Sequence, residues 1–274
     1  MHKKITIARF LTSPSLLLSN SYMQVYSYLH GAIPEGVGIV ADIPLDSDIF
    51  AYNHIAYNVT SFGFDILLSG SADSYKNEII QGTIQILSSG IGPKRKFKYE
   101  VKEVALKEIS NETEFLFEDS VCETLLFSEH KSHLSDFGNF DDVRVKVKIE
   151  FLTPTVILSD GKGTNSPSYE TLYNRSLNRL ITLGLVADES KLYLKDNLYF
   201  PNDDSFTVFA KRKRRSARGD FSHNLVGFMG VLSYEIPDNL FFKTYGYINE
   251  SLKWGIGKTP SLGLGRGKIQ WNFV

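Results

Sequence analysis

The sequence predicts an α+β fold, because segments with the two-residue alternation of strands recur around segments with helical spacing. The C-terminal half carries this signal most clearly, with six such segments in the order strand, helix, strand, strand, helix, strand. They lie at residues 143–158, 169–185, 205–210, 225–236, 237–254 and 268–273. This β-α-β-β-α-β order is the ferredoxin-like arrangement, whose topology the RNA-reading RRM domain shares.

The two helices of this half have recognisable boundaries. In the first, apolar residues between Leu172 and Ile181 repeat at helical spacing, and Gly184 is expected to end the helix. The second opens at Pro237 and Asp238, which suit the first turn and the N-cap of a helix. The first helix is therefore amphipathic, and the second is expected to end near Trp254.

The N-terminal half gives a less regular version of the same order. Strand-like and helix-like segments alternate in it, at residues 3–11, 17–33, 55–69, 71–87 and 94–105. We expect Pro34 and Gly36 to end the first helix, since neither residue continues a helix well. The sequence therefore predicts two tandem ferredoxin-like domains, at residues 1–142 and 143–274, with a boundary near residue 142.

The composition is that of an ordinary globular protein, with 42% hydrophobic and 22% charged residues. Cys122 is the only cysteine, which excludes an internal disulfide framework and a thiolate zinc cluster. We see no signal peptide and no uninterrupted apolar run long enough to span a bilayer. These features favour a reducing, cytoplasmic setting without a membrane partner.

Charge is distributed unevenly along the chain, although the formal net charge is only −1. Residues 1–142 hold 11 Lys/Arg and 19 Asp/Glu, a balance of −8, whereas residues 143–274 hold 19 and 12, a balance of +7. Six cations gather near the tip of a predicted hairpin: Lys211, Arg212, Lys213, Arg214, Arg215 and Arg218. Such a cluster could be a solvated loop, but in a basic half-chain it also favours binding to nucleic acid.

The stretch before the last strand is rich in glycine. Five glycines fall within residues 255–267, at Gly255, Gly257, Gly263, Gly265 and Gly267. Three cations are interleaved with them or follow them: Lys258, Arg266 and Lys268. Two interpretations stay open, a loop whose N–H groups and cations face phosphates, and a tight turn before an edge strand. The spacing matches neither a Walker P-loop nor the dinucleotide fingerprint.

This Gly-rich stretch resembles the signature of the CRISPR-associated RAMP superfamily. Three further stretches resemble its pre-crRNA-processing endoribonucleases. They are Phe151–Pro154 followed by a helix with Arg179 and Leu180; Asn224–Gly230 leading to Tyr234; and Phe64–Gly70 followed by a helix, Gly90-Ile-Gly92 and a basic strand. The resemblance covers most of the chain and implies two ferredoxin-like domains that cleave CRISPR repeat RNA to mature crRNA.

The resemblance also implies a chemistry without metal or cofactor. The 2′-hydroxyl attacks the neighbouring phosphate, and the products carry a 2′,3′-cyclic phosphate and a 5′-hydroxyl. Histidine suits the general base of this reaction, because its pKa lies near neutrality. The family's catalytic residue usually lies on or just after the first helix, which makes His30 the best match, although it could instead cap the end of that helix. His54 is the second candidate, and Tyr28 could donate a proton to the leaving group.

RNA binding is expected from the cations and glycines of the C-terminal half. The predicted contacts are Lys211, Arg212, Lys213, Arg214, Arg215, Arg218, Lys258, Arg266, Lys268, Gly255, Gly257, Gly263, Gly265 and Gly267. A bulky residue at Gly263 or Gly265 is therefore expected to weaken RNA binding. The expected partners are CRISPR repeat RNA and crRNA, with other CRISPR effector subunits as further candidates, for a monomer or homodimer.

Two alternative functions stay open at this point. The chain could be a non-catalytic RAMP subunit that binds crRNA within a CRISPR effector complex. It could also be a ferredoxin-like protein outside CRISPR biology whose basic surface binds another polyanion. Cleavage of repeat RNA by the purified protein would separate the endoribonuclease from both alternatives.

Overall fold

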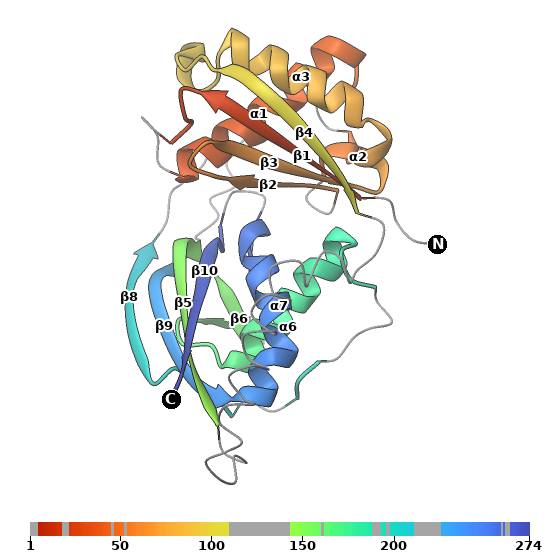
Figure 1. Ribbon diagram of the computed structural model, residues 1–274. Coiled ribbons are helices and arrows are strands. Elements are labelled where there is room, and N and C mark those ends of the chain that lie inside the picture. Colours follow the sequence, from red (N-terminus) through yellow and green to blue (C-terminus); the bar gives the residue numbers. More distant parts are fainter. Residues whose placement is uncertain are drawn as a thin grey trace. The chain divides into compact units, whose positions relative to one another are not determined.

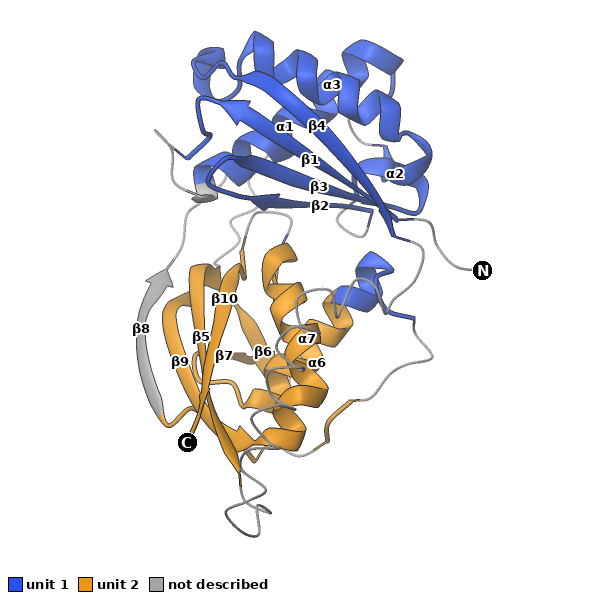
Figure 2. Ribbon diagram, in the orientation of Figure 1, with its two compact units in different colours: residues 1–112, 180–188, 259–263 blue, residues 113–179, 189–258, 264–274 orange. Residues whose placement is uncertain are grey.

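The computed structural model has two compact units (Figure 2). It describes residues 5–17, 22–44, 47–51, 54–109, 143–159, 162–187, 193–195, 198–210, 226–258, 260 and 264–274. The N-terminal unit consists of Met1–Glu112, Leu180–Asp188 and Thr259–Gly263, and the C-terminal unit of the remaining residues. The domain boundary predicted near residue 142 lies outside the described residues and stays a prediction.

The N-terminal unit is built on a four-stranded antiparallel sheet with the order β2-β3-β1-β4. Its strands are β1 (Ile5–Ser13), β2 (Ile55–Val59), β3 (Gly63–Ser69) and β4 (Glu100–Ile109). Helices α1 (Tyr22–Ala41) and α3 (Lys76–Ser89) lie together on one face of the sheet (Figure 1). The short segments are α2 (Ser71–Ser74) and the 3-10 turns η1 (Asp48–Phe50) and η2 (Pro93–Arg95).

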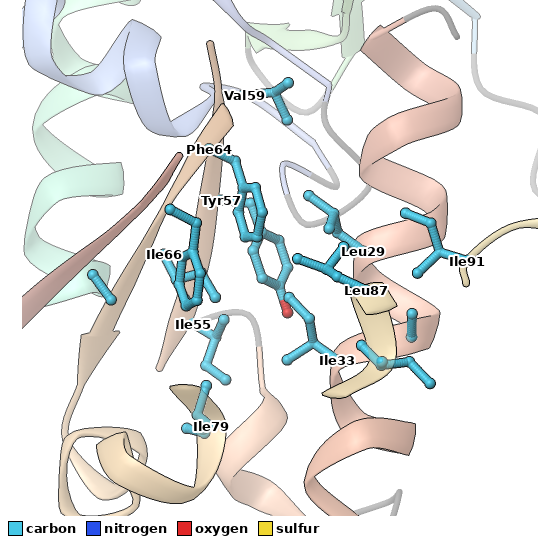
Figure 3. Close-up of a cluster of buried hydrophobic side chains, with 14 of the residues drawn as sticks. Leu29, Ile33, Ile55, Tyr57, Val59, Phe64, Ile66, Ile79, Leu87 and Ile91 are labelled. Atoms are coloured by element: carbon cyan, nitrogen blue, oxygen red, sulfur yellow. The ribbon is translucent and has the colours of Figure 1, made fainter. Parts of the chain in front are cut away.

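The core of this unit lies between the sheet and its two helices. Figure 3 shows Phe64 and Ile66 of β3 and Tyr57 of β2 beside Leu29 of α1 and Leu87 of α3. All five side chains are buried. Burial of such side chains contributes about 1.5–3 kcal/mol each, so this layer is the main source of stability of the unit.

Helix α1 continues past its predicted end. Pro34 and Gly36 both lie inside it, and it ends only at Ala41. Pro34 cannot donate to the carbonyl of His30 four residues earlier, a defect that costs about 3 kcal/mol in an isolated helix. Close packing on α3 offsets it, since a methyl carbon added to Gly36 would lie 2.2 Å from the carbonyl oxygen of Gly82. The predicted helix end is therefore wrong, because tertiary packing overrides the local signal.

Replacing Gly36 with alanine is expected to destabilise the N-terminal unit by about 1–3 kcal/mol, because the added methyl forces α1 and α3 apart. Gly31→Ala is the matched control on the same helix, since a methyl carbon there would meet nothing within 4 Å. Urea unfolding followed by far-UV circular dichroism measures both variants. Equal midpoints for the two variants would contradict the close contact between these helices.

The C-terminal unit repeats the same topology. Its antiparallel sheet has the order β10-β5-β9-β8. The strands are β5 (Arg144–Thr155), β8 (Asp203–Ala210), β9 (Val226–Pro237) and β10 (Gly267–Phe273). The helices are α7 (Asp238–Trp254) and α6 (Tyr169–Leu183), whose last residues, from Leu180, are counted with the N-terminal unit. A small hairpin, β6 (Ile157–Ser159) with β7 (Lys162–Thr164), follows β5. In both units the first strand lies between the third and the fourth, which confirms the predicted tandem ferredoxin-like fold.

Two local predictions for the N-terminal half need correction. The helix predicted over 71–87 is divided at Tyr75 into α2 and α3. The strand predicted over 94–105 begins only at Glu100, because residues 93–98 form a tight turn before it. This turn places a group of cations outside the sheet.

Candidate functional site

Two buried arginines lie at the C-terminal end of α7. Arg179 of α6 is 6% exposed, and its Nη2 donates to the carbonyl oxygen of Trp254 at 3.2 Å. Arg266 is 4% exposed, and its Nη1 donates to the carbonyl oxygen of Lys253. The last carbonyl groups of a helix have no partners within it and carry partial negative charge. These arginines therefore cap α7 and connect it to α6 and to the strand that follows.

The Gly-rich stretch is bonded to the end of β5. The amide of Gly265 donates to the carbonyl of Pro154 at 3.1 Å, and the amide of Lys258 donates to that of Val156 at 2.9 Å. The amide of Ile256 donates to the carbonyl of Gly265 at 3.0 Å within the stretch itself. These three N–H groups are thus committed to the fold of the C-terminal unit.

Close backbone contact explains why glycines occur here. Gly265 has φ of +74°, and a methyl carbon on it would lie 1.9 Å from the carbonyl oxygen of Ile256. Gly257 has φ of +82°, and its methyl carbon would lie 2.3 Å from the carbonyl oxygen of Val156. Gly255 also has positive φ, where it ends α7. Only glycine fits such positions without strain, so these residues have a structural reason to be glycine.

The cations of this stretch and the predicted contacts that lie outside the described residues divide into three groups. Lys258 and Lys268 are exposed, and the Nζ of Lys268 lies 3.1 Å from a carboxylate oxygen of Glu150. Arg266 does not fit the predicted phosphate contact, because its guanidinium is buried against Lys253. Gly263 and the cluster Lys211, Arg212, Lys213, Arg214, Arg215 and Arg218 lie outside the described residues.

A basic face of the C-terminal sheet is absent from the sequence-based candidates. Along β5, Arg144, Lys146 and Lys148 are exposed, whereas the residues between them are buried. Lys148 is paired with Gln270 of the neighbouring β10, which is also exposed. Arg144 further lines a pocket of about 400 Å³ with Glu235 and residues 198–202. The sequence contains the pattern that could have identified this face, namely the strict alternation of cations and apolar residues at the start of β5.

The two α1 candidates lie on different sides of the helix. Tyr28 and His30 are both partly exposed, and two residues along a helix are about 200° apart. The buried stripe of α1, which includes Leu29 and Ile33, runs between them. His30 lies in the middle of α1, so a helix-end cap is not its role. The helix thus does not bring the two candidates to one reaction centre.

The surroundings of Tyr28 and His54 are also defined. The Tyr28 ring stacks on Phe97 with ring centroids 5.9 Å apart. His54 directly precedes β2, and its Nδ1 would lie 2.7 Å from a methyl carbon placed on Gly70. Its backbone also bonds to β3, where the Ser69 amide donates to the His54 carbonyl at 2.9 Å. Both side chains are therefore positioned by packing within the N-terminal unit.

Within the ranges that the structure describes, no helix has the length and apolar character needed to cross a membrane. Among the same residues, no group of three or more His, Cys, Asp or Glu side chains is arranged to hold a metal ion.

The fold matches solved structures, although no family model and no curated protein sequence matches this chain. The product complex of a Thermus thermophilus Cas6 has a TM-score of 0.52 and 13% identity, and the match covers 98% of this chain and all of that chain. A second Cas6 product complex has a TM-score of 0.50 and 13% identity, over 98% of this chain and 99% of that one.

A third match is a partial Cas6-RT-Cas1–Cas2 complex, with a TM-score of 0.51 and 8% identity, over 98% of this chain and 46% of that chain. Identities this low establish shared architecture. This chain therefore has the tandem ferredoxin-like fold of the Cas6 structures, in agreement with its sequence resemblance to pre-crRNA-processing RAMP proteins.

Proposed function

We propose that this chain is an endoribonuclease that cleaves CRISPR repeat RNA to give mature crRNA in the cytoplasm. The observation that carries the proposal is a match over 98% of the chain to Cas6 product complexes. Three sequence stretches that resemble pre-crRNA-processing endoribonucleases, together with a Gly-rich stretch that resembles the RAMP signature, support it independently of the fold. Fold alone does not determine activity, so the proposal rests on these two lines together.

The proposed reaction is a transesterification within the RNA. The 2′-oxygen loses its proton to a general base and attacks the adjacent phosphorus, and the bond from phosphorus to the 5′-oxygen breaks. The departing 5′-oxygen takes a proton from an acid. The products are a 2′,3′-cyclic phosphate and a 5′-hydroxyl, and the two proton transfers require groups within hydrogen-bond reach.

His30 is the proposed general base. Its imidazole is partly exposed on α1, and neutral imidazole accepts a proton efficiently near pH 7. His54 is the second candidate for this role. Its ring lies against Gly70, which leaves it fewer directions from which a substrate could approach. Tyr28 lies about 200° from His30 around the helix, so we assign it no proton transfer in the same centre.

RNA is proposed to bind along exposed cations of the C-terminal unit. The candidates among the described residues are Lys258, Lys268, Lys146 and Lys148, all of which are exposed. The basic cluster Lys211, Arg212, Lys213, Arg214, Arg215 and Arg218, which lies outside the described residues, is proposed to bind RNA as well. The buried Arg266 and the bonded glycines would act indirectly, by holding the shape of the Gly-rich stretch.

Purified protein is expected to cut repeat RNA in the presence of EDTA, because no step of the proposed reaction uses a metal. A single 2′-deoxy substitution just upstream of the scissile phosphate is expected to abolish cutting, since it removes the nucleophile. A 2′-deoxy substitution one nucleotide further upstream is the control and should be cut normally. Product lengths and 2′,3′-cyclic phosphate ends are measured by gel electrophoresis and mass spectrometry.

Each other outcome of this experiment selects a different function. RNA that binds but is never cut would favour the non-catalytic RAMP subunit. Cutting of the deoxy substrate would exclude 2′-hydroxyl attack, and no binding of any RNA would exclude the whole proposal.

A further inference from the structure

A tight turn between α3 and β4 carries an unusual density of positive charge. We call residues Gly92–Lys98 the basic turn. It holds four cations within five residues, and all four are exposed or partly exposed: Lys94, Arg95, Lys96 and Lys98. The turn belongs entirely to the N-terminal unit, whose residues hold 10 Lys/Arg and 12 Asp/Glu, a balance of only −2. Four of the ten Lys/Arg residues of a nearly neutral unit thus gather in one turn, and such a local concentration of positive charge favours an anionic partner.

The backbone of the basic turn is fixed at its base. Ile91 and Phe97 exchange two backbone hydrogen bonds, of 2.8 and 3.1 Å, which close the turn. Gly90 has φ of +111°, and a methyl carbon on it would lie 2.3 Å from the carbonyl oxygen of Arg95. The base of the turn is thus as tightly packed as the backbone at Gly257 of the C-terminal unit, where the corresponding distance is also 2.3 Å.

Two of the cations adopt a conformation that non-glycine residues rarely take. Lys94 has φ of +56° and Arg95 has φ of +52°. Each such residue costs about 1 kcal/mol or more relative to an ordinary backbone conformation. Strain of this kind persists where the surrounding structure imposes it, and it clusters at functional sites.

Side chains at the base of the turn attach it to α1. Phe97 stacks on the ring of Tyr28, and Arg95 forms an ion pair with Glu35, about two turns further along the helix. Lys96 lies with its Nζ 5.8 Å from the Phe97 ring centroid. In the described part of the chain, no carboxylate lies within ion-pair distance of Lys94, Lys96 or Lys98.

We propose that the basic turn binds backbone phosphates of the RNA through Lys94, Lys96 and Lys98. This inference rests on the proposed function and adds a second RNA-binding surface, on the N-terminal unit. Arg95 holds the turn on α1, and the three lysines contact phosphates of the RNA strand. A membrane surface fits less well, because no large apolar side chain of the turn is exposed. A phosphate chain fits well, since three flexible ammonium groups on a fixed backbone can each meet one phosphate.

The test compares two triple variants that remove the same charge. The turn variant is Lys94→Gln, Lys96→Gln and Lys98→Gln, which keeps most of the side-chain length. The control variant is Lys162→Gln, Lys195→Gln and Lys243→Gln, which alters three exposed lysines of the C-terminal unit. Kd for repeat RNA is measured for both variants and for the unaltered protein over a range of salt concentrations.

The turn variant is expected to bind at least about tenfold more weakly at about 0.1 M salt, and its plot of log K against log salt should be shallower by about 2. Each phosphate of a single strand that a protein neutralises contributes about 0.7 to this slope, so the loss of three phosphate contacts makes the slope shallower by about 2. The control variant should keep the slope of the unaltered protein. If the unaltered protein binds and cuts RNA but both variants have the same salt slope, the proposed role of the turn is overturned and the proposed function is not. Failure of the unaltered protein to bind RNA would overturn the proposed function with it.

Discussion

Replacing His30 with alanine is expected to slow cleavage of repeat RNA by about 100- to 10,000-fold, the usual contribution of a positioned general base. RNA affinity should stay within about twofold, because a general base accepts the proton as neutral imidazole, and that form makes no charge interaction with the phosphates. Single-turnover rates and Kd, measured on the same preparations, separate these two effects. Adding imidazole to the variant should restore part of the missing rate if the deleted group is a base.

His54→Ala and Tyr28→Phe are the matched variants for this experiment. Tyr28→Phe removes only a hydroxyl group and keeps the ring that stacks on Phe97. It should leave the cleavage rate within a few-fold, since Tyr28 and His30 face different sides of α1. If His54→Ala abolishes cleavage and His30→Ala does not, His54 is the base. If neither histidine matters, another group is the general base, and the 2′-deoxy substrate decides whether the 2′-hydroxyl is the nucleophile.

The order of elements was predictable because both sheets follow simple patterns. On β5, for example, the alternation from Arg144 to Phe151 matches alternate exposed and buried positions. The continuation of α1 past Pro34 was not predictable, because it depends on Gly36 packing on Gly82, 46 residues away in sequence. Local signals report local preference, and here a long-range contact outweighs them.

The same limit applies to the Gly-rich stretch. Sequence shows that Gly257 and Gly265 free the backbone, but not whether a ligand or another part of the protein approaches it. The approaching groups are the carbonyls of Val156 and Ile256. Likewise, the role of Arg266 depends on Thr153, which lies 113 residues earlier in the sequence. The backbone amide of Arg266 donates a hydrogen bond to the Oγ1 of Thr153 at 2.9 Å. Only the folded chain could distinguish a phosphate ligand from a cap for α7.

Replacing Gly265 with alanine is expected to destabilise the C-terminal unit by about 3 kcal/mol or more. The positive φ alone costs about 1–2 kcal/mol for a residue with a side chain. The methyl carbon would in addition lie 1.9 Å from the carbonyl oxygen of Ile256, so one of the two segments must move. That movement would also weaken the bond from the Gly265 amide to Pro154.

Tryptophan fluorescence during urea unfolding measures this effect in the unit concerned. The chain has two tryptophans, Trp254 and Trp271, and both lie in the C-terminal unit. Trp254 is buried and directly precedes the stretch that Gly265 closes. Gly163→Ala in the same unit is the control, because a methyl carbon there meets nothing within 4 Å and φ is not in the left-handed region.

The variant also decides why these glycines matter for RNA. If they serve mainly to fold the stretch, Gly265→Ala should weaken RNA binding in proportion to the unfolded fraction, and added RNA should raise its unfolding midpoint. If Gly265 instead lets phosphates approach the backbone, the affinity of Gly265→Ala for RNA should fall, while its urea midpoint measured by tryptophan fluorescence should equal that of Gly163→Ala. The bonds from this stretch to Pro154 and Val156 favour the first outcome, in which the Gly-rich stretch supports the RNA-binding surface by holding β5, α7 and β10 together.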